Sequence, residues 1–279
     1  MNILDSILLG IIQGLTEFIP VSSTAHLLIG QRLLGLTTDS GMFSFTVLIQ
    51  LGTLFALIVY YWTDLWSIGK AVLSDIWYGL LTRRQQPFKN QQALLGWYIL
   101  LGTIPAALAG LLMKNLIESL FKTQLVEALI RLLITTILLL VAEIFGHRNR
   151  KMVDLKWTDG LWVGIAQVLA VFPGSSRSGS TIAGGMLLNL DRPTAARFAF
   201  LLSVPVMLAA GAYETFDLLR SQHVAGSLVP SILIGILVSA VVGYLSIRWL
   251  LNFLARRPLY IFAAYCGIVV IVIAISLLM

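Results

Sequence analysis

Two short segments of the chain combine hydroxyl-bearing side chains with ionisable ones. The first, Gln13–His26, contains Glu17. The second, Phe172–Thr181, contains Arg177. In each segment serine follows a proline, where a new helix is expected to begin, and such residues cap N-termini whose free N–H groups carry a positive partial charge. Two such termini with an arginine between them predict an anion site, and the planar arginine fork suits phosphate well.

The first segment also has the residues of a hydroxyl nucleophile. His26 follows Ser23 by three positions, so both side chains lie on one face if a helix begins there. That spacing fits a serine whose proton is removed by an imidazole. Glu17 is placed either to orient the imidazole or to hold a divalent cation together with phosphate groups. Gln13 cannot ionise, so it can bind or orient but cannot be the base.

The composition is typical of a membrane protein. Of 279 residues, 58% are hydrophobic and 11% are charged, whereas soluble domains carry roughly 25% charged residues. We therefore expect an all-α polytopic protein in which residues 1–279 form a single membrane domain. The apolar stretches long enough to span, at ~20 residues each, are Phe43–Trp62, Leu94–Met113, Leu125–Phe145, Phe198–Ala212 (long enough only with its neighbours), Leu228–Leu250 and Leu259–Leu278.

Basic residues gather in the connections between these stretches. The connections Thr63–Gln92 and Gly146–Thr158 carry four lysines or arginines each. This is the positive-inside pattern, so the net charge of +6 indicates cytoplasmic loops and no nucleic-acid partner. Glu127 and Arg131, four positions apart near the end of a stretch, are expected to form a structural ion pair.

The chain contains an internal repeat. Gly10–Gln13 recurs as Gly164–Gln167, and Phe43–Phe45 recurs as Phe198–Phe200. The offset between matching residues stays close to 154 positions, as between Gly10 and Gly164. A constant offset over separate matches favours duplication over chance.

The two repeats cover approximately residues 1–146 and 159–279. Each is predicted to be a broken pair of short helices, at about 1–36 and 159–192, followed by three membrane-spanning helices. Three spans lie between the pairs, so the repeats are expected to have inverted topology. The two pairs then form re-entrant hairpins that enter from opposite faces and meet near the midplane, where non-helical backbone must be buried or line a wet cavity.

The polar residues of the turns have a structural interpretation as well as a functional one. Serine-rich turns beside glycine often serve only to cap helices and to allow close packing. An ionisable residue inside the membrane is by default a candidate for function, and Glu17, His26 and Arg177 all lie at the predicted turns.

The sequence has no P-loop motif and no HExxH or deaminase zinc motif, which argues against those hydrolase classes.

The two segments resemble both signatures of the bacitracin-resistance family of undecaprenyl-diphosphatases. The first reads QGLTEFIPVSSTAH from Gln13, and the second reads PGSSRSGST from Pro173. Membership implies hydrolysis of undecaprenyl diphosphate to undecaprenyl phosphate and inorganic phosphate, at the outer, periplasmic face of the bacterial plasma (inner) membrane. This reaction recycles the lipid carrier for cell-wall synthesis and confers bacitracin resistance. The resemblance also implies a divalent cation, Mg²⁺ or Ca²⁺.

The resemblance implies roles for individual residues. Ser23 attacks the terminal phosphorus with His26 as base, or His26 or a metal-bound water attacks and Ser23 only binds. Arg177 stabilises charge on the transferred phosphoryl group, and Glu17 is catalytic and is the residue expected to hold the cation. Some family members have Glu at the position of Gln13, and Gly is usual where this chain has Ala25. The residues expected to bind substrate are Gln13, Ser22, Thr24, Ser175, Ser176, Ser178, Gly179 and Thr181.

A transporter or flippase of undecaprenyl phosphate is the main alternative function. Many carriers build their substrate site from inverted repeats with broken helices. A pure transporter needs no nucleophile or base, so Glu17 and His26 favour the enzyme, and an architectural protein would leave both unexplained. The expected partners are a polyprenyl diphosphate and membrane lipids, with no nucleic acid, and a homodimer is compatible with the sequence.

Overall fold

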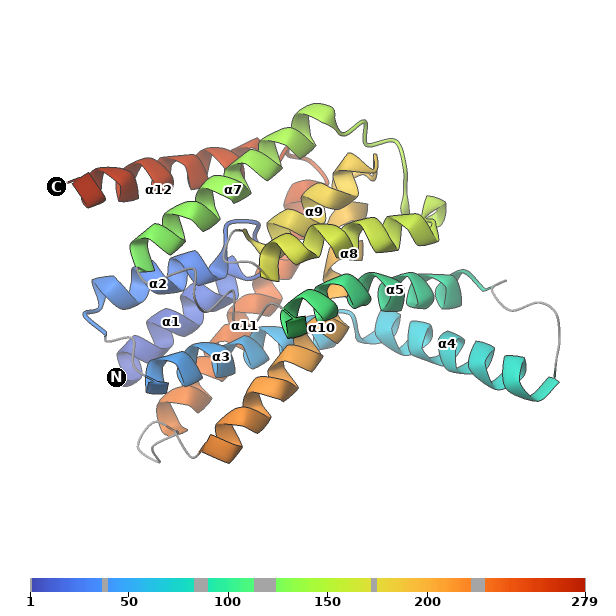
Figure 1. Ribbon diagram of the computed structural model, residues 1–279, viewed down its shortest axis with the longest axis horizontal. Helices are drawn as coiled ribbons and strands as arrows, with labels where there is room; N and C mark the ends of the chain where they lie inside the picture. Colours follow the sequence, from blue (N-terminus) through green and yellow to red (C-terminus); the bar gives the residue numbers. More distant parts are fainter. Residues whose placement is uncertain are drawn as a thin grey trace.

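The computed structural model describes residues 2–36, 40–82, 90–112, 124–171, 175–221 and 229–278. Within these ranges the elements are helices, and no strand is formed beyond one isolated bridge between Arg150 and Leu190. The expectation of an all-α protein is confirmed. The elements, shown in Figure 1, are α1 (Ile3–Thr16), α2 (Ser23–Leu33), α3 (Ser40–Tyr60), α4 (Trp62–Thr82), α5 (Gln91–Leu112), α7 (Gln124–Phe145), the 3₁₀ turn η1 (Met152–Asp154), α8 (Trp157–Val171), α9 (Arg177–Leu187), α10 (Arg192–Ser221), α11 (Val229–Leu254) and α12 (Tyr260–Leu278).

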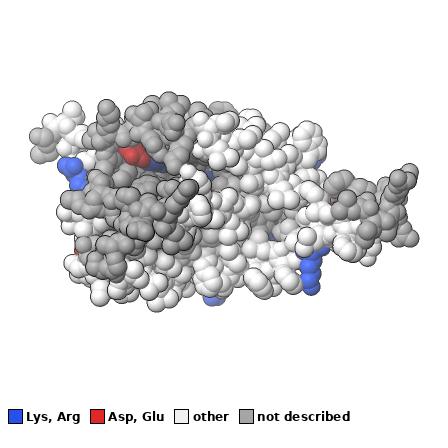
Figure 2. All heavy atoms as spheres, turned by 60° about the horizontal axis from the view of Figure 1, so that its bottom comes forward, with Lys and Arg blue, Asp and Glu red and all other residues white. Residues whose placement is uncertain are grey.

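Helices of membrane-spanning length and composition occur at each predicted span. In the described ranges α5, α7, α10, α11 and α12 qualify alone, and α3 qualifies together with α4, from which it is bent by 76°. On the face drawn in Figure 2, the described surface carries few charged side chains, and many exposed side chains are leucine, isoleucine or valine. The chain is an integral membrane protein, because such a surface is stable only against lipid tails.

The connection Thr63–Gln92 was predicted to be a basic loop, and this prediction is wrong for its first two-thirds. Residues 62–82 form α4. Ile68 is buried and Leu65 and Val72 pack against the core, so the apolar positions follow helical spacing. Charged side chains along α4 made this segment look like a loop in the sequence. One of them, Lys70, has its Nζ atom 4.9 Å from the centroid of the Trp66 ring. The basic residues at 83, 84 and 89 lie outside the described residues.

Both predicted broken helix pairs are present. The first pair is α1 followed by α2, and the second is α8 followed by α9. These helices have 14, 11, 15 and 11 residues, so each is too short to cross a bilayer alone. Phe172, Pro173 and Gly174, in the second turn, lie outside the described residues. The opposite orientation of the two repeats stays a prediction.

The two pairs pack against corresponding helices of the other half. α1 packs along α11, and α8 packs along α5 (Figure 1). The contact of α8 with α5 is made backbone to backbone, because a Cβ atom on Gly164 would overlap the carbonyl oxygen of Gly102. In the contact of α1 with α11, a Cβ atom on Gly14 would lie 2.9 Å from the backbone nitrogen of Gly243. Glycine therefore sets how closely each hairpin approaches its neighbour.

Replacing Gly164 with alanine is expected to destabilise the protein by about 1–3 kcal/mol, the usual cost of overpacking a tight contact. The added methyl group meets backbone, which cannot rotate away, so α8 must move from α5. Thermal unfolding in detergent measures the effect. Gly69→Ala on α4 is the matched control, because no atom lies within 4 Å of its added Cβ, and alanine favours helix by about 1 kcal/mol. Equal melting temperatures for the two variants would contradict this account of the contact.

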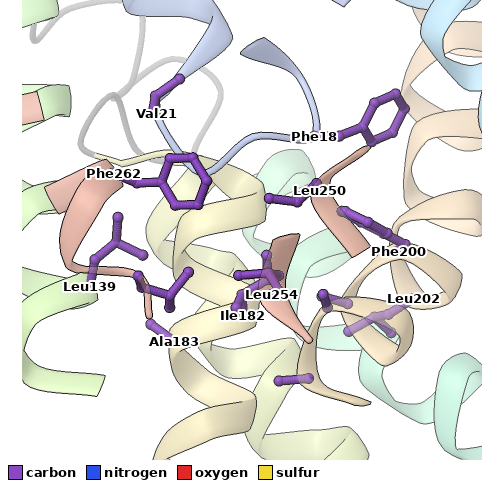
Figure 3. Close-up of a cluster of buried hydrophobic side chains, with 14 of the residues drawn as sticks. Phe18, Val21, Leu139, Ile182, Ala183, Phe200, Leu202, Leu250, Leu254 and Phe262 are labelled. Carbon is purple, nitrogen blue, oxygen red and sulfur yellow. The ribbon is translucent and has the colours of Figure 1, made fainter. Parts of the chain in front are cut away.

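A buried apolar cluster supports the turns from below. It includes Phe18 of the first turn, Ile182 of α9, Leu139 of α7 and Leu250 of α11 (Figure 3). Phe18 meets the ring of Phe200 edge to face, with centroids 5.5 Å apart. Helices from both halves of the chain thus hold the first turn against the second hairpin.

A buried carboxylate joins three elements at one end of this core. Glu143, at 3% exposure, accepts hydrogen bonds from Arg148 at 2.5 Å, from Arg192 and from the backbone N–H of Leu259 at 3.0 Å. These bonds connect the end of α7 with the start of α10 and the start of α12. They satisfy the buried charge and fix helices on which the second hairpin rests.

Candidate functional site

Glu17 is the centre of a hydrogen-bond network at the first turn. It caps the C-terminus of α1 and is 7% exposed. Its Oε2 atom accepts hydrogen bonds from Gln13 Nε2 at 2.9 Å and from Ser23 Oγ at 2.7 Å. Its Oε1 atom forms an ion pair with Arg177. Residues that are 160 positions apart are thus joined by one carboxylate, and the buried charge is compensated.

The network faces a cavity of about 200 Å³ between the two hairpins. Its lining residues come from both turns and from α3, α7, α8 and α10. They are Glu17, Ser22, Ser23, Thr24, Gln50, Arg131, Gln167, Ala170, Ser175, Ser176, Arg177 and Val206. The structure therefore brings together predicted residues from both segments around one polar, partly open cavity.

Ser22 has an unusual backbone conformation beside this cavity. Its φ is 68° and its ψ is 93°, and its side chain makes no cap hydrogen bond although it precedes α2. Positive φ is uncommon for a residue with a Cβ atom and is often found at functional sites. The serine cap expected at the start of this helix is therefore not formed by Ser22, which instead lies at the cavity wall.

The serines of the second turn have both structural and site-facing positions. Ser176 caps α9, since its Oγ atom accepts a hydrogen bond from the N–H of Gly179 at 3.1 Å. Its own N–H donates to Thr135 Oγ1 of α7 at 2.9 Å. Ser178 donates to the carbonyl of Ile19 at 3.3 Å and so bridges to the first turn. The capping interpretation is confirmed for Ser176, which also lines the cavity, and its role in binding substrate stays a prediction.

Ser178, Gly179 and Thr181 do not line the main cavity. Ser178 and Thr181 border a small adjacent void of about 10 Å³ that also touches Glu17 and Arg177. Thr181 Oγ1 donates to the carbonyl of Arg177 at 2.8 Å. Of the residues in the second turn, Ser175, Ser176 and Arg177 line the main cavity.

His26 does not meet Ser23 in the structure. Its Nδ1 atom bonds to the carbonyl of Ser22 at 2.8 Å, and its Nε2 atom bonds to the hydroxyl of Tyr265 on α12 at 2.8 Å. The rings of His26 and Tyr265 stack with centroids 5.6 Å apart. Ser23 and His26 both lie in the first turn of α2, as expected. The imidazole, however, points towards α12. The expected serine–histidine pair is not formed.

Known proteins are similar to this chain over the sequence that forms these two turns. The profile of a family described as bacitracin resistance protein BacA matches residues 6–272, which include both of them. The chain belongs to the BacA family. BacA relatives with curated names are similar over nearly all of the chain.

Three such relatives show the extent of the similarity. An undecaprenyl-diphosphatase of Anaeromyxobacter dehalogenans (strain 2CP-1 / ATCC BAA-258) is 44% identical over 266 residues, covering 95% of this chain and 88% of the relative. An undecaprenyl-diphosphatase of Chlorobium luteolum is 44% identical over 275 residues, covering 95% and 93%. One of Myxococcus xanthus is 39% identical over 265 residues, covering 95% and 86%.

Three polar residues at the cavity of this BacA protein were not predicted to belong to the site. Gln50, Arg131 and Gln167 all line it. The ion pair of Arg131 with Glu127 was predicted and is confirmed, at 2.7 Å. The sequence signal that could have identified Gln167 was its match to Gln13 in the internal repeat. The signal for the other two was a polar side chain within an apolar stretch, which is expensive in a membrane.

Proposed function

We propose that this chain hydrolyses undecaprenyl diphosphate to undecaprenyl phosphate and inorganic phosphate. The names of its BacA relatives support this activity. The single observation that carries it is the carboxylate of Glu17, which bonds to both the Ser23 hydroxyl and the Arg177 guanidinium at the wall of a polar cavity. Phosphoryl transfer to a serine needs a base, a hydroxyl nucleophile and a positively charged side chain that binds the phosphate. Glu17, Ser23 and Arg177 are these three groups.

The hydrogen bonds favour Glu17 over His26 as the group that accepts the proton. The Ser23 proton already points to Glu17 Oε2. The Ser23 oxygen then attacks the terminal phosphorus, the bond to the bridging oxygen breaks, and undecaprenyl phosphate leaves. Water hydrolyses the phosphoserine and releases inorganic phosphate. Because Ser23 and Arg177 share one carboxylate, the phosphorus that Ser23 attacks lies within reach of the guanidinium, which stabilises the developing charge.

A divalent cation, Mg²⁺ or Ca²⁺, is part of the proposal. The described residues contain no group of three or more His, Cys, Asp or Glu side chains that could hold a metal. Mg²⁺, however, is often bound by one or two carboxylates together with substrate phosphates. Glu17 and the buried Oε1 atom of Gln13, which has no hydrogen-bond partner, are oxygen donors that fit such a cation. When bound, it would neutralise charge on the diphosphate.

The proposed setting is the bacterial plasma membrane, with the cavity open to the outer, periplasmic face. The positive-inside distribution of the loops supports this orientation. Hydrolysis there would return the lipid carrier to cell-wall synthesis and protect against bacitracin. The apolar helix surfaces beside the cavity would accommodate the polyprenyl tail, since only the diphosphate needs polar surroundings.

The purified protein in detergent is expected to release phosphate from undecaprenyl diphosphate when Mg²⁺ or Ca²⁺ is present. EDTA should lower the rate by roughly 10²-fold or more, because a cation contributes several kcal/mol of charge stabilisation at a phosphoryl group. Adding the cation back should restore the rate. A colorimetric phosphate assay measures this, and the melting temperature should stay constant because Arg177 compensates Glu17 without the cation.

Undecaprenyl phosphate is the matched control substrate and should release no phosphate. A protein that binds the diphosphate but releases no phosphate under any cation would rule out the enzyme. The broken helix pairs would then favour the transporter. Movement of labelled undecaprenyl phosphate across proteoliposomes would measure that activity.

A further inference from the structure

Gln167 on α8 is a buried amide with no partner. It is 1% exposed, and neither its Oε1 atom nor its Nε2 atom has a hydrogen-bond partner among the described residues. It lines the cavity between the hairpins. Buried side-chain amides are nearly always hydrogen-bonded, so an unpaired one at a cavity wall indicates a ligand.

The repeat explains why this amide is free. Its counterpart Gln13 donates to Glu17, four positions later on the same helix. The residue four positions after Gln167 is Val171, which has no acceptor to offer. The second hairpin therefore keeps the glutamine but lacks the acid, and its amide is available for something that enters the cavity.

Arg131 of α7 contributes a charge to the same wall. Its Nε and Nη2 atoms donate to Glu127 Oε1 at 2.9 and 2.7 Å, and Glu127 does not line the cavity. One turn later, Thr135 accepts the N–H of Ser176, which fixes this part of α7 beside the second turn. Arg131 is thus held in a defined position with guanidinium donors left for a ligand.

We propose that Gln167 and Arg131 form a second phosphate subsite, which binds the phosphate that stays on the lipid. This inference rests on the proposed hydrolysis and specifies its substrate class. Arg177 and Ser23 would hold the phosphate that is transferred. A diphosphate then contacts both arginines, whereas a monophosphate can contact only one. The site selects diphosphates over monophosphates, and hydrolysis separates the two bound groups, which favours release of the products.

The test uses methylenediphosphonate and methylphosphonate, because neither probe can be hydrolysed. Their binding to the purified full chain with Mg²⁺ is measured by calorimetry. Gln167→Leu and Arg131→Lys should each weaken methylenediphosphonate binding about tenfold or more, as expected for one lost hydrogen bond to a charged group. Methylphosphonate binding should change by less than about twofold.

Gln31→Leu is the matched control. Gln31 is also a buried glutamine, at 3% exposure, but it bonds to Thr46 at 2.9 Å and does not line the cavity. This control should leave the preference for the diphosphonate unchanged. Gln167→Leu should also raise the melting temperature, because it removes an unpaired buried amide, so weakened binding cannot be attributed to unfolding.

Unchanged diphosphonate binding in Gln167→Leu and Arg131→Lys would overturn the subsite, and so would an equal loss for both probes. The proposed hydrolysis fails separately, if wild-type protein releases no phosphate from undecaprenyl diphosphate. Since the probes report binding without turnover, the two failures are distinguishable.

Discussion

Arg177→Lys is expected to lower kcat/KM for undecaprenyl diphosphate by roughly 10³-fold, the range seen when a phosphate-stabilising arginine or an oxyanion donor is lost. Lysine keeps the positive charge that compensates the buried carboxylate of Glu17. It cannot, however, offer two parallel donors to a phosphate. Phosphate release at varied substrate concentration measures the effect, and it should fall mainly on kcat, because the contact strengthens in the transition state.

Arg197→Lys is the control for this experiment. Arg197 pairs with Asp64 at 2.8 Å, half exposed and away from the cavity, so its replacement should leave the rate within about twofold of wild type, as for other exposed ion pairs. If Arg177→Lys were as active as Arg197→Lys while both remained folded, Arg177 would not contact the transferred phosphate.

Glu17→Gln is expected to lower kcat by roughly 10³-fold, within the range for loss of a general base. The amide retains the shape of the side chain but cannot take the proton of Ser23. Ser23→Ala should cost a similar factor. The double variant should be little worse than either single one, because residues that act as a unit are not additive.

His26→Asn separates this mechanism from the serine–histidine pair implied by the family resemblance. Asparagine retains a donor near the position of Nδ1, which bonds to Ser22. With Glu17 as the base, His26→Asn should cost no more than about tenfold, well below the loss for a catalytic base. A loss equal to that of Glu17→Gln, at an unchanged melting temperature, would identify His26 as the base instead.

The spans and the turns were predictable because each has a strong local signal. Apolar length identifies α5, α7, α11 and α12, and the serine-rich segments identify both turns. Helix α4 was missed because Asp64, Lys70 and Asp75 lower its mean hydropathy. Its apolar face is visible only at helical spacing, which a search for uniform apolar runs does not detect.

The partners of individual site residues depended on packing that the sequence does not display. Spacing brought Ser23 and His26 onto one helix, but it carried no information about Tyr265, which lies 239 positions away and takes up Nε2. Likewise, the bond of Gln13 to Glu17 spans only four positions, but only the folded chain joins Glu17 to Arg177. Local arguments therefore identified residues that meet at the cavity, and long-range contacts determined their hydrogen-bond partners.

The backbone-to-backbone contacts at Gly164 and Gly14 have a consequence for how substrate reaches the site. Interdigitated side chains can slide past one another by changing rotamers, but two helix backbones in contact have no such freedom. Each hairpin is therefore clamped to a long helix of the opposite half, α8 to α5 and α1 to α11. A clamped hairpin cannot rock between two faces of the bilayer without breaking that contact. For the proposed hydrolysis, the charged head group would then travel to a site that does not move.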